Sequence, residues 1–427
     1  MSTIFALATA RGKAGVAVIR VSGPQAFGVA DRLVSTLPDS GRFGLRKIRS
    51  TAGEILDDAL VLVFSAPHSF TGEDVVEFHL HGSRAVINAV ESAILNTGLA
   101  RPAEAGEFTR RALMNDRLDL AQVEGLSDLI EAETEAQRQQ AMRLYEGGLQ
   151  ETSEIWRRDL IRAAGLIEAT IDFADEDVPV DVAPEVLDLL ERTRSTIRRE
   201  IEGSRIGERI REGFEVAILG APNAGKSTLL NRIAKRDVAI TSEIAGTTRD
   251  VIEVRVDLGG LPVVFLDTAG LRETEDQIEK IGVARARERA KAADLRVLLL
   301  SDDEADGSDV MCQGDIAVRS KGDLRDGDGI SGLTGQGVDA LLSSITAVLS
   351  ERADKVATAT TARHRHALQQ AETELDVAEQ LLVAEAGLPE FAAEHLRSAV
   401  TALDSLIGRV DVETVLGEIF ANFCIGK

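Results

Sequence analysis

The segment Gly220-Ala-Pro-Asn-Ala-Gly225-Lys226-Ser227 constrains the fold of this chain more than any other feature of its sequence. It fits the pattern G-x4-G-K-[ST], it follows the apolar run Phe214–Leu219, and a helix is predicted to begin near Ser227. In this strand–loop–helix context the glycines let backbone N–H groups turn toward phosphate oxygens, and the amino end of the helix adds positive charge. Lys226 supplies a mobile charge, and the Ser227 hydroxyl can ligate magnesium. The alternative is an ordinary glycine-rich turn, which this context disfavours.

The chain of 427 residues is too long for one ordinary domain, and three kinds of sequence pattern follow one another along it. Residues 1–118 mix short β-branched runs with Gly, Pro and Asp, which predicts an α+β domain. Apolar residues at three- and four-residue spacing predict helices over 119–211, with a break at Asp172–Pro184. Strands alternate with helices over 212–353, which is typical of an α/β sheet, and 354–427 is helical again.

Two helical blocks therefore flank one α/β block. The economical interpretation is a single all-α domain with the α/β domain inserted into it, because insertion is tolerated where the ends of the host lie close together. Ser301–Gly329 is rich in Gly and Asp, so we expect it to be mostly loop and partly mobile.

Composition excludes several classes of protein. Acidic residues number 71 and basic residues 48, and the net charge of −23 argues against a generally basic nucleic-acid coat, though not against a local basic patch. Aromatic residues make up 4%, too few for extensive stacking on bases. Two cysteines, Cys312 and Cys424, cannot form a disulfide framework and suggest a reducing compartment. No apolar run is long enough to cross a bilayer and no signal peptide is evident, so we expect a soluble, cytoplasmic protein.

Further elements of a nucleotide site follow in the expected order. Asp267-Thr268-Ala269-Gly270 comes directly after an apolar run, where the acid can hold magnesium through water and the glycine can meet the γ-phosphate. Gly246–Asp250 lies between the two motifs as a candidate switch, and the Thr248 hydroxyl can complete the magnesium shell. Leu271 stands where Ras-like GTPases place the glutamine that orients the attacking water, so hydrolysis here needs another means of aligning that water.

The element that selects the base is expected later in the domain. GTPases usually carry Asn-Lys-x-Asp, whose acid accepts hydrogen bonds from guanine, and this chain has Ser320-Lys321-Gly322-Asp323. Ser331–Gly335 is the expected final base-contacting loop. The pattern favours guanine over adenine, while an ATPase and a generic acidic loop at Asp323 remain as alternatives.

Motifs outside the P-loop extend along nearly the whole chain: Gly15–Gly23, Ser69–Asp74, Glu77, Gly106–Phe108, Asn115–Gln122, Ile171–Phe173, Ser242–Asp250 and Phe423–Lys427. Together and in this order they resemble the MnmE (TrmE) family of tRNA-modifying GTPases. The resemblance implies an α+β amino-terminal folate-binding and dimerisation domain (1–118), an all-α helical domain in two parts (119–211 and 354–427) and an inserted Ras-like α/β P-loop GTPase domain (212–353).

The resemblance also implies how hydrolysis is achieved without the glutamine. A potassium ion takes the place of an arginine finger, held by Asn223 and Thr247 and by backbone carbonyls of Ser242 and Ile244, and it offsets charge that develops on the phosphates. Glu279 matches the residue that positions the attacking water through a second water, although an exposed helical acid is the alternative. The expected catalytic residues are Glu279, Lys226 and Thr248, and the expected magnesium ligands are Ser227 and Thr248.

The full set of expected nucleotide-binding residues is Asn223, Ala224, Gly225, Lys226, Ser227, Thr228, Ser242, Glu243, Ile244, Ala245, Gly246, Thr247, Thr248, Asp267, Thr268, Ala269, Gly270, Ser320, Lys321, Asp323, Ser331, Gly332 and Leu333. By the same resemblance, Arg20, Glu77, Arg117 and Lys427 bind 5-formyltetrahydrofolate or methylene-tetrahydrofolate, with Arg117 where the family more often has lysine. From the sequence alone, the first two can equally be solvent-facing charges. Zinc at His79 and His81 lacks a visible third ligand, and Cys424 is either a nucleophile or an inert thiol.

The implied activity is potassium-stimulated GTP hydrolysis with Mg²⁺. A homodimer joins a flavin-dependent, MnmG-type partner in a heterotetramer. Together they modify the 5-position of the wobble uridine of certain tRNAs with a carboxymethylaminomethyl or aminomethyl group, and the folate supplies the one-carbon unit. The alternative is a regulatory GTP switch in ribosome or complex assembly without RNA chemistry. Such a switch should carry a basic RNA-binding appendage, whereas this chain carries the folate-type motifs.

Overall fold

The computed structural model describes residues 2–172, 182–236, 239, 253–267, 287–301, 308–324, 329–353, 357–383, 389–410, 420, 423 and 426. By its packing the chain divides into two compact units. The first unit consists of Met1–Ser127 with Ile407–Lys427, and the second of Asp128–Leu406. Among the described residues, every helix is too short or too polar to cross a membrane.

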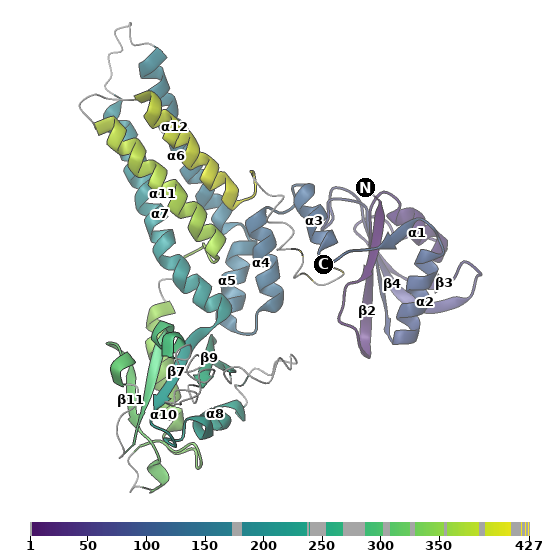
Figure 1. Cartoon of the computed structure of the whole chain (residues 1–427). Coiled ribbons are helices and arrows are strands. Elements are labelled where there is room, and N and C mark those ends of the chain that lie inside the picture. The colour runs from purple at the N-terminus through teal and green to yellow at the C-terminus, as the bar shows by residue number, and fades with distance from the viewer. Residues whose placement is uncertain are drawn as a thin grey trace, which may run out of the picture. The chain divides into compact units, whose positions relative to one another are not determined.

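The first unit is built on a six-stranded sheet (Figure 1). Its strands are β1 (Thr3–Leu7), β2 (Ala14–Ser22), β3 (Phe43–Arg49), β4 (Ile55–Phe64), β5 (Val75–Gly82) and β6 (Ala100–Pro102), in the order β3-β4-β5-β2-β1-β6. β1 and β6 are parallel, and the other neighbours are antiparallel. The helices are α1 (Ala26–Leu33), α2 (Arg84–Leu95), α3 (Glu107–Met114) and the start of α4 (Leu120–Glu131). Side chains of α1 and α2, among them Val29 and Val90, pack with alternate strand residues such as Ile19 and Phe78 to form the core.

The opposite face of this sheet is partly bare. Because residues paired across strands point to the same face, the register aligns Phe43, Leu62, Glu77 and Arg20 in one row. It aligns Leu45, Leu60, His79 and Val18 in the next row. Side chains of Phe43, Leu45 and Val16 are 71%, 68% and 54% exposed. We call Val16, Val18, Phe43, Leu45, Leu60 and Leu62 the outer sheet face.

The end of the chain returns to this first unit. The rings of Phe420 and Phe423 pack in a tilted arrangement, with centroids 5.5 Å apart, against Gly106, and Gly426 contacts the backbone of Leu7. The sequence analysis grouped these residues with the helical domain. The division by packing places them with the first unit, and the two aromatic side chains are buried together with Val123 of α4.

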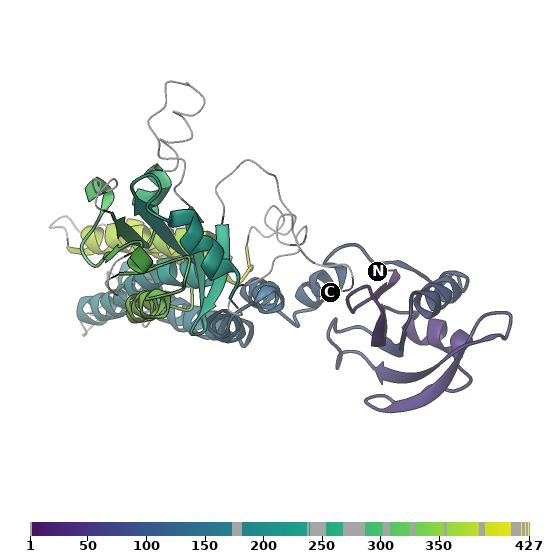
Figure 2. The same cartoon turned by 90° about the horizontal axis from the view of Figure 1, so that it is seen from below.

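The second unit contains a helical bundle interrupted by a sheet domain. The bundle is formed by α6 (Gly148–Asp172), α7 (Ala183–Glu212), α11 (Ala362–Val383) and α12 (Pro389–Leu406), with α5 (Glu135–Tyr145) beside it. Figures 1 and 2 show the teal helices from before the sheet domain side by side with the yellow helices from after it. A hydrogen bond of 2.8 Å from the Trp156 indole to Thr196 joins α6 to α7. The inserted architecture predicted from the sequence is therefore confirmed.

The inserted domain is a five-stranded sheet covered on both faces. Its strands are β7 (Phe214–Gly220), β8 (Glu253–Leu258), β9 (Leu261–Asp267), β10 (Leu295–Leu300) and β11 (Ile316–Arg319), in the order β11-β10-β7-β9-β8, with β8 antiparallel. Helices α8 (Lys226–Ala234) and α10 (Val338–Ala353) cover one face, and Ala290 and Ala293 contribute to the core on the other. This confirms the predicted α/β domain.

The loop-rich stretch of this domain also contains short regular elements. The stretch Ser301–Gly329, expected to be mostly loop, contains strand β11 and 3₁₀ turns at Ser308–Val310 and Gly322–Leu324. β11 has only four residues and lies at the edge of the sheet, paired in parallel with β10. Such a short run between Asp and Gly carries too little periodicity to be recognised in a sequence.

Candidate functional site

The P-loop connects the central strand β7 to helix α8, as the sequence predicted (Figure 1). Gly220 ends the strand with a φ of +143°, and a Cβ at this position would lie 2.7 Å from the Leu299 carbonyl oxygen. Asn223 and Gly225 also have positive φ values, of +61° and +95°, so the loop curls sharply before the helix. The backbone N–H groups at the start of α8 therefore point toward the space enclosed by the loop.

Lys226 and Ser227 follow at the first turn of α8. The Lys226 ammonium donates to the carbonyl oxygens of Gly220 and Ala221, at 2.6 and 3.1 Å, so its charge lies within the curve of the loop. The Ser227 hydroxyl donates to the Asp267 carboxylate at 3.1 Å. Asp267 is the last residue of β9 and is buried. A hydroxyl and a carboxylate oxygen beside the loop are donors of the kind that magnesium prefers, and the magnesium roles of Ser227 and Asp267 stay predictions.

The predicted base-contacting segments also lie in the inserted domain. Ser320 is buried at the end of β11, and Lys321, with a φ of +55°, and Asp323 are exposed on the turn that follows. Ser331 is buried, while Leu333 is exposed two residues further on. The remaining predicted P-loop residues differ in exposure: Ala224 is buried in the core, whereas Thr228 is exposed on α8.

Several predicted residues lie outside the described residues: Ser242, Glu243, Ile244, Ala245, Gly246, Thr247, Thr248, Thr268, Ala269, Gly270, Glu279 and Lys427. The same holds for Leu271 and Cys424. The predicted potassium site is therefore described only at Asn223, and the predicted water-positioning residue is not described.

The first unit brings two predicted folate residues together. Arg20 on β2 and Glu77 on β5 are register partners, and their side chains form an ion pair with an Nε–Oε1 distance of 2.7 Å. The guanidinium of Arg20 also lies 5.7 Å from the ring centroids of Phe70 and Phe108. Both charged side chains are mostly buried, with 22% and 15% exposure, so they are not the ordinary surface charges that the sequence left as an alternative.

Glu77 has a second partner. The Nε2 atom of His79 lies 3.1 Å from Oε2 of Glu77. Burial alone would raise the pKa of Glu77, but the charge and hydrogen bond of Arg20, together with His79, outweigh it and leave the pKa below its usual value. Glu77 is therefore an ionised acceptor held between two donors. His81 bonds instead to Asp57, at 2.7 Å, so the two histidines considered for zinc are bonded to different carboxylates.

The other two predicted folate residues are less well placed by the structure. Arg117 is exposed, and its side-chain carbons lie against Gly72 of the segment Ser69–Asp74. Lys427 lies outside the described residues, while its neighbour Gly426 contacts the end of β1. β1 is the strand next to Arg20 in the sheet.

The sequence analysis missed a buried ion cluster beside this site. Arg111 donates to Glu73 at 2.9 Å, to Glu107 at 2.9 Å and to the Ser2 carbonyl at 2.7 Å. Ser22, on β2, donates to Glu73 at 2.7 Å. Glu107 and Arg111 are four residues apart on α3, which in a sequence is typical of an exposed helical pair, so no signal pointed to their burial.

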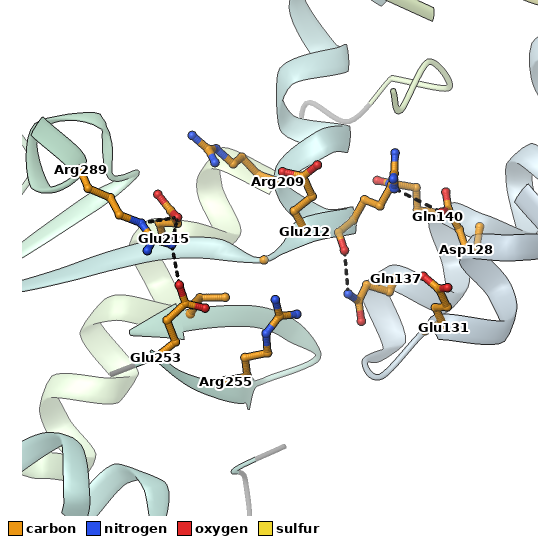
Figure 3. Close-up of a pocket in the computed structure, with 15 residues that line it drawn as sticks. Asp128, Glu131, Gln137, Gln140, Arg209, Glu212, Glu215, Glu253, Arg255 and Arg289 are labelled. Carbon is orange, nitrogen blue, oxygen red and sulfur yellow. Dashed lines mark hydrogen bonds and ion pairs between the residues drawn. The ribbon is translucent and has the colours of Figure 1, made fainter. Parts of the chain in front are cut away.

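A second feature that the sequence did not indicate is a cavity of about 380 Å³ at the amino end of β7, the end opposite the P-loop (Figure 3). Arg289 bridges Glu215 and Glu253 there, each at 2.8 Å. On the helical side, Gln137 donates to the carbonyl of Arg211 at 3.0 Å. The cavity is lined by arginines and carboxylates in nearly equal number, so it lacks the one-sided charge of a phosphate site.

Comparison with known proteins covers the whole chain. Residues 3–117 match the family described as "GTP-binding protein TrmE N-terminus", and residues 120–424 match "MnmE helical domain". The chain is 60% identical over 427 residues to a protein of Jannaschia sp. (strain CCS1) and 58% identical over 429 residues to one of Roseobacter denitrificans. Both are named tRNA modification GTPase MnmE, and both comparisons cover 100% of each chain. Among solved structures, Era of Aquifex aeolicus bound to GDP and AlF4⁻ matches 45% of this chain and 89% of that chain, with 19% identity and a TM-score of 0.27.

Proposed function

This chain belongs to the MnmE family of tRNA modification GTPases, and from that membership we propose that it hydrolyses GTP in a potassium-stimulated reaction. The observation that carries the proposal is the P-loop site itself. Lys226, Ser227 and Asp267 converge at the carboxyl ends of β7 and β9, with the Ser320–Asp323 turn following β11 of the same sheet.

In the proposed reaction each described residue has a separate task. The N–H groups of the P-loop and α8 bind phosphate oxygens, and Lys226 exchanges its two carbonyl partners for the β- and γ-phosphates. Ser227 and Asp267 would hold magnesium, which when bound neutralises charge on the phosphates. We assign guanine selection to the Asp323 carboxylate and potassium binding to Asn223 with Ser242, Ile244 and Thr247. Thr248 completes the magnesium shell, and Glu279 positions the water that attacks.

Hydrolysis of GTP and ATP, each measured in potassium and in sodium at equal ionic strength, tests this proposal. We expect GTP to be preferred, and hydrolysis in potassium to be faster by at least about tenfold, because a fixed cation offsets charge developing in the transition state. The control is Lys226→Ala, which should lose most of the activity in either salt. A preference for ATP, or equal rates in the two salts, would contradict the mechanism.

The second part of the proposal is a folate site at Arg20, Glu77, Arg117 and Lys427. Its support is the mostly buried Arg20–Glu77 pair, since a carboxylate accepts from the N–H groups of a pterin-type ring and a guanidinium donates to carbonyl or carboxylate oxygens. Bound there, 5-formyl- or methylene-tetrahydrofolate supplies a one-carbon unit. The residues of this chain bind and orient it.

Equilibrium binding of 5-formyltetrahydrofolate checks that site. Arg20→Ala should weaken binding by about tenfold to a hundredfold, the worth of a charge-assisted hydrogen bond. Arg110→Ala, which removes an exposed arginine from α3, serves as the matched control and should bind like the unaltered chain. If the unaltered chain binds no folate, the site is wrong and a regulatory switch becomes the better interpretation.

We further propose that the chain acts as a homodimer through the outer sheet face. Phe43 and Leu45 lie beside Leu62 and Leu60 in the register and form an exposed apolar strip, and such strips on soluble domains commonly mark protein interfaces. The occupant we infer is the same face of a second copy, because the row Phe43–Leu62–Glu77–Arg20 continues from the strip to the folate pair. A two-fold interface on this face would bring two folate sites toward each other.

The modification step completes the proposal. With a flavin-dependent, MnmG-type partner in a heterotetramer, the dimer modifies the 5-position of the wobble uridine of certain tRNAs. GTP hydrolysis drives opening and closing of the GTPase domains rather than the carbon chemistry. Because the net charge is −23, RNA contact is delegated to the partner or to local patches, and binding of tRNA by the isolated chain should be weak and salt-sensitive. Tight binding of tRNA by the chain without its partner would contradict that division of tasks.

A further inference from the structure

One arginine on the P-loop helix contacts the loop expected to touch the base. The guanidinium of Arg232, on α8, donates from Nε to the Gly332 carbonyl oxygen at 3.1 Å and from Nη2 to the Leu333 carbonyl oxygen. Gly335 lies against the same guanidinium, since a Cβ there would be 3.6 Å from its central carbon. Arg232 therefore fills the turn formed by residues 331–335.

That turn is seated directly on the helix that begins with Lys226. A Cβ at Gly332 would lie 2.6 Å from the Leu229 backbone nitrogen and 2.7 Å from the Thr228 carbonyl carbon, so only a glycine permits this approach. Within the turn, Gly335 donates its backbone N–H to Ser331 at 2.8 Å, and Ser331 donates to Gln336 at 2.9 Å. The turn is thus closed on itself and held against α8.

Backbone hydrogen bonds continue from this turn to the acidic segment. Ile330 donates its N–H to the Arg319 carbonyl at 2.8 Å, and Gly322 donates to the Ile330 carbonyl at 3.0 Å. Gly322 directly precedes Asp323, the carboxylate assigned to guanine. A continuous chain of contacts therefore runs from Arg232 through the 331–335 turn and Ile330 to Asp323.

Ser320 does not extend this chain toward the P-loop. Its hydroxyl donates at 3.1 Å to the Leu300 carbonyl at the end of β10, and its side chain is buried there. Serine is shorter than the asparagine usual at this position, and its hydroxyl bonds to Leu300, which holds the segment to β10. A connection between the phosphate helix and the base segments is instead made by Arg232.

We propose that Arg232 is a positioning residue for nucleotide selection. It holds the base-contacting turn, and through that turn Asp323, at a fixed distance from the phosphate helix. The inference rests on the proposed guanine site and deepens it, since it names what keeps the acid in place. Without this contact the segment that carries Asp323 would have to be ordered each time the nucleotide binds, which lowers affinity.

Equilibrium binding of GDP, IDP and ADP to the full chain tests this. IDP lacks the 2-amino group that donates to Asp323, and ADP binds through its phosphates. Arg232→Ala should weaken GDP binding by about tenfold, the worth of two hydrogen bonds to carbonyls, and leave ADP binding within about twofold. It should therefore lower the preferences for GDP over ADP and over IDP. In hydrolysis, KM for GTP should rise with kcat nearly unchanged.

Two further variants and a control make the result specific. Arg236→Ala, just beyond the end of α8 and paired with Asp339, is the matched control and should behave like the unaltered chain. Gly332→Ala displaces the turn while Arg232 remains. It should likewise weaken GDP binding and leave ADP binding nearly unchanged. Arg232→Lys keeps the charge but cannot donate two hydrogen bonds in the same geometry. Its GDP affinity should lie between those of Arg232→Ala and the unaltered chain. Thermal unfolding identifies any of these three variants that fails to fold, and the other two then test the proposal.

The possible outcomes distinguish a failure of the role proposed for Arg232 from a failure of the proposed guanine site. If Arg232→Ala and Gly332→Ala keep the full preference for GDP, Arg232 has no positioning role. If both weaken GDP, IDP and ADP equally, the arginine supports the helix as a whole and the inference is overturned. If the unaltered chain binds ADP as tightly as GDP, the proposed guanine site itself fails.

Discussion

Replacement of both Phe43 and Leu45 by glutamate is expected to convert the proposed homodimer into a monomer. Each side chain is about 70% exposed in the isolated unit (71% and 68%), so the substitutions remove little from the core and the unit should still fold. In a dimer the same positions would bury two unpaired carboxylates from each copy. The dissociation constant should rise by at least about a hundredfold, because each buried charge without a partner costs several kcal/mol.

Sedimentation velocity over a range of protein concentrations measures this change directly. Phe391→Glu is the matched control, since Phe391 on α12 is also an exposed phenylalanine, at 58%, but lies in the second unit. It should leave the sedimentation of the dimer unchanged. A double variant that sediments as the unaltered chain does would show that the outer sheet face is not the interface.

The second large effect is expected from Arg111→Met in the first unit. Arg111 and Glu107 are 4% and 3% exposed, and removal of the guanidinium leaves the carboxylates of Glu107 and Glu73 without one of their donors in a buried setting. Loss of one partner from a buried ion pair typically costs about 3–5 kcal/mol. The first unit should therefore unfold at a clearly lower temperature. Arg110→Met, its exposed neighbour, should have little effect.

The distribution of fluorophores allows the two units to be followed separately. Trp156 and Tyr145 are the single tryptophan and tyrosine of the chain, and both belong to the second unit. Calorimetry should thus record a lower transition in Arg111→Met, while the fluorescence transition stays in place. A shift of both transitions together, or of neither, would contradict a role confined to the first unit.

Acid should act on the same cluster. Burial alone would raise the pKa of Glu107 above its usual value of 4.5. Hydrogen bonds from Arg101, the Glu104 backbone and Arg111 outweigh burial and hold the pKa at about 2. Because the folded pKa is the lower one, the stabilisation is present above about pH 4.5 and is lost as the pH falls toward 2. In Arg111→Met the folded pKa of Glu107 should lie closer to 4.5, so the loss should be smaller and should be complete at a higher pH, which the same calorimetric series detects.

The features that the sequence predicted well are those that local chemistry determines. The P-loop is specified by glycines and Lys226 within one short segment, and the insertion by a change of periodicity near Phe214. The pairing of Arg20 with Glu77 could not be worked out from spacing, because it depends on strand register across 57 residues. Arg232 gave no signal at all, since its partners are backbone carbonyls a hundred residues away.

The return of the chain's end to its beginning has a consequence for synthesis on the ribosome. Translation proceeds from the amino terminus, so α6 and α7 emerge long before α11 and α12, and their apolar faces must wait for the whole inserted domain to be made. The first unit is completed later still, because Phe420 and Phe423 are synthesised after α11 and α12. Nascent chains of this protein should therefore depend on chaperones until Phe423 has been translated, and stop codons shortly before Phe420 should be unusually harmful.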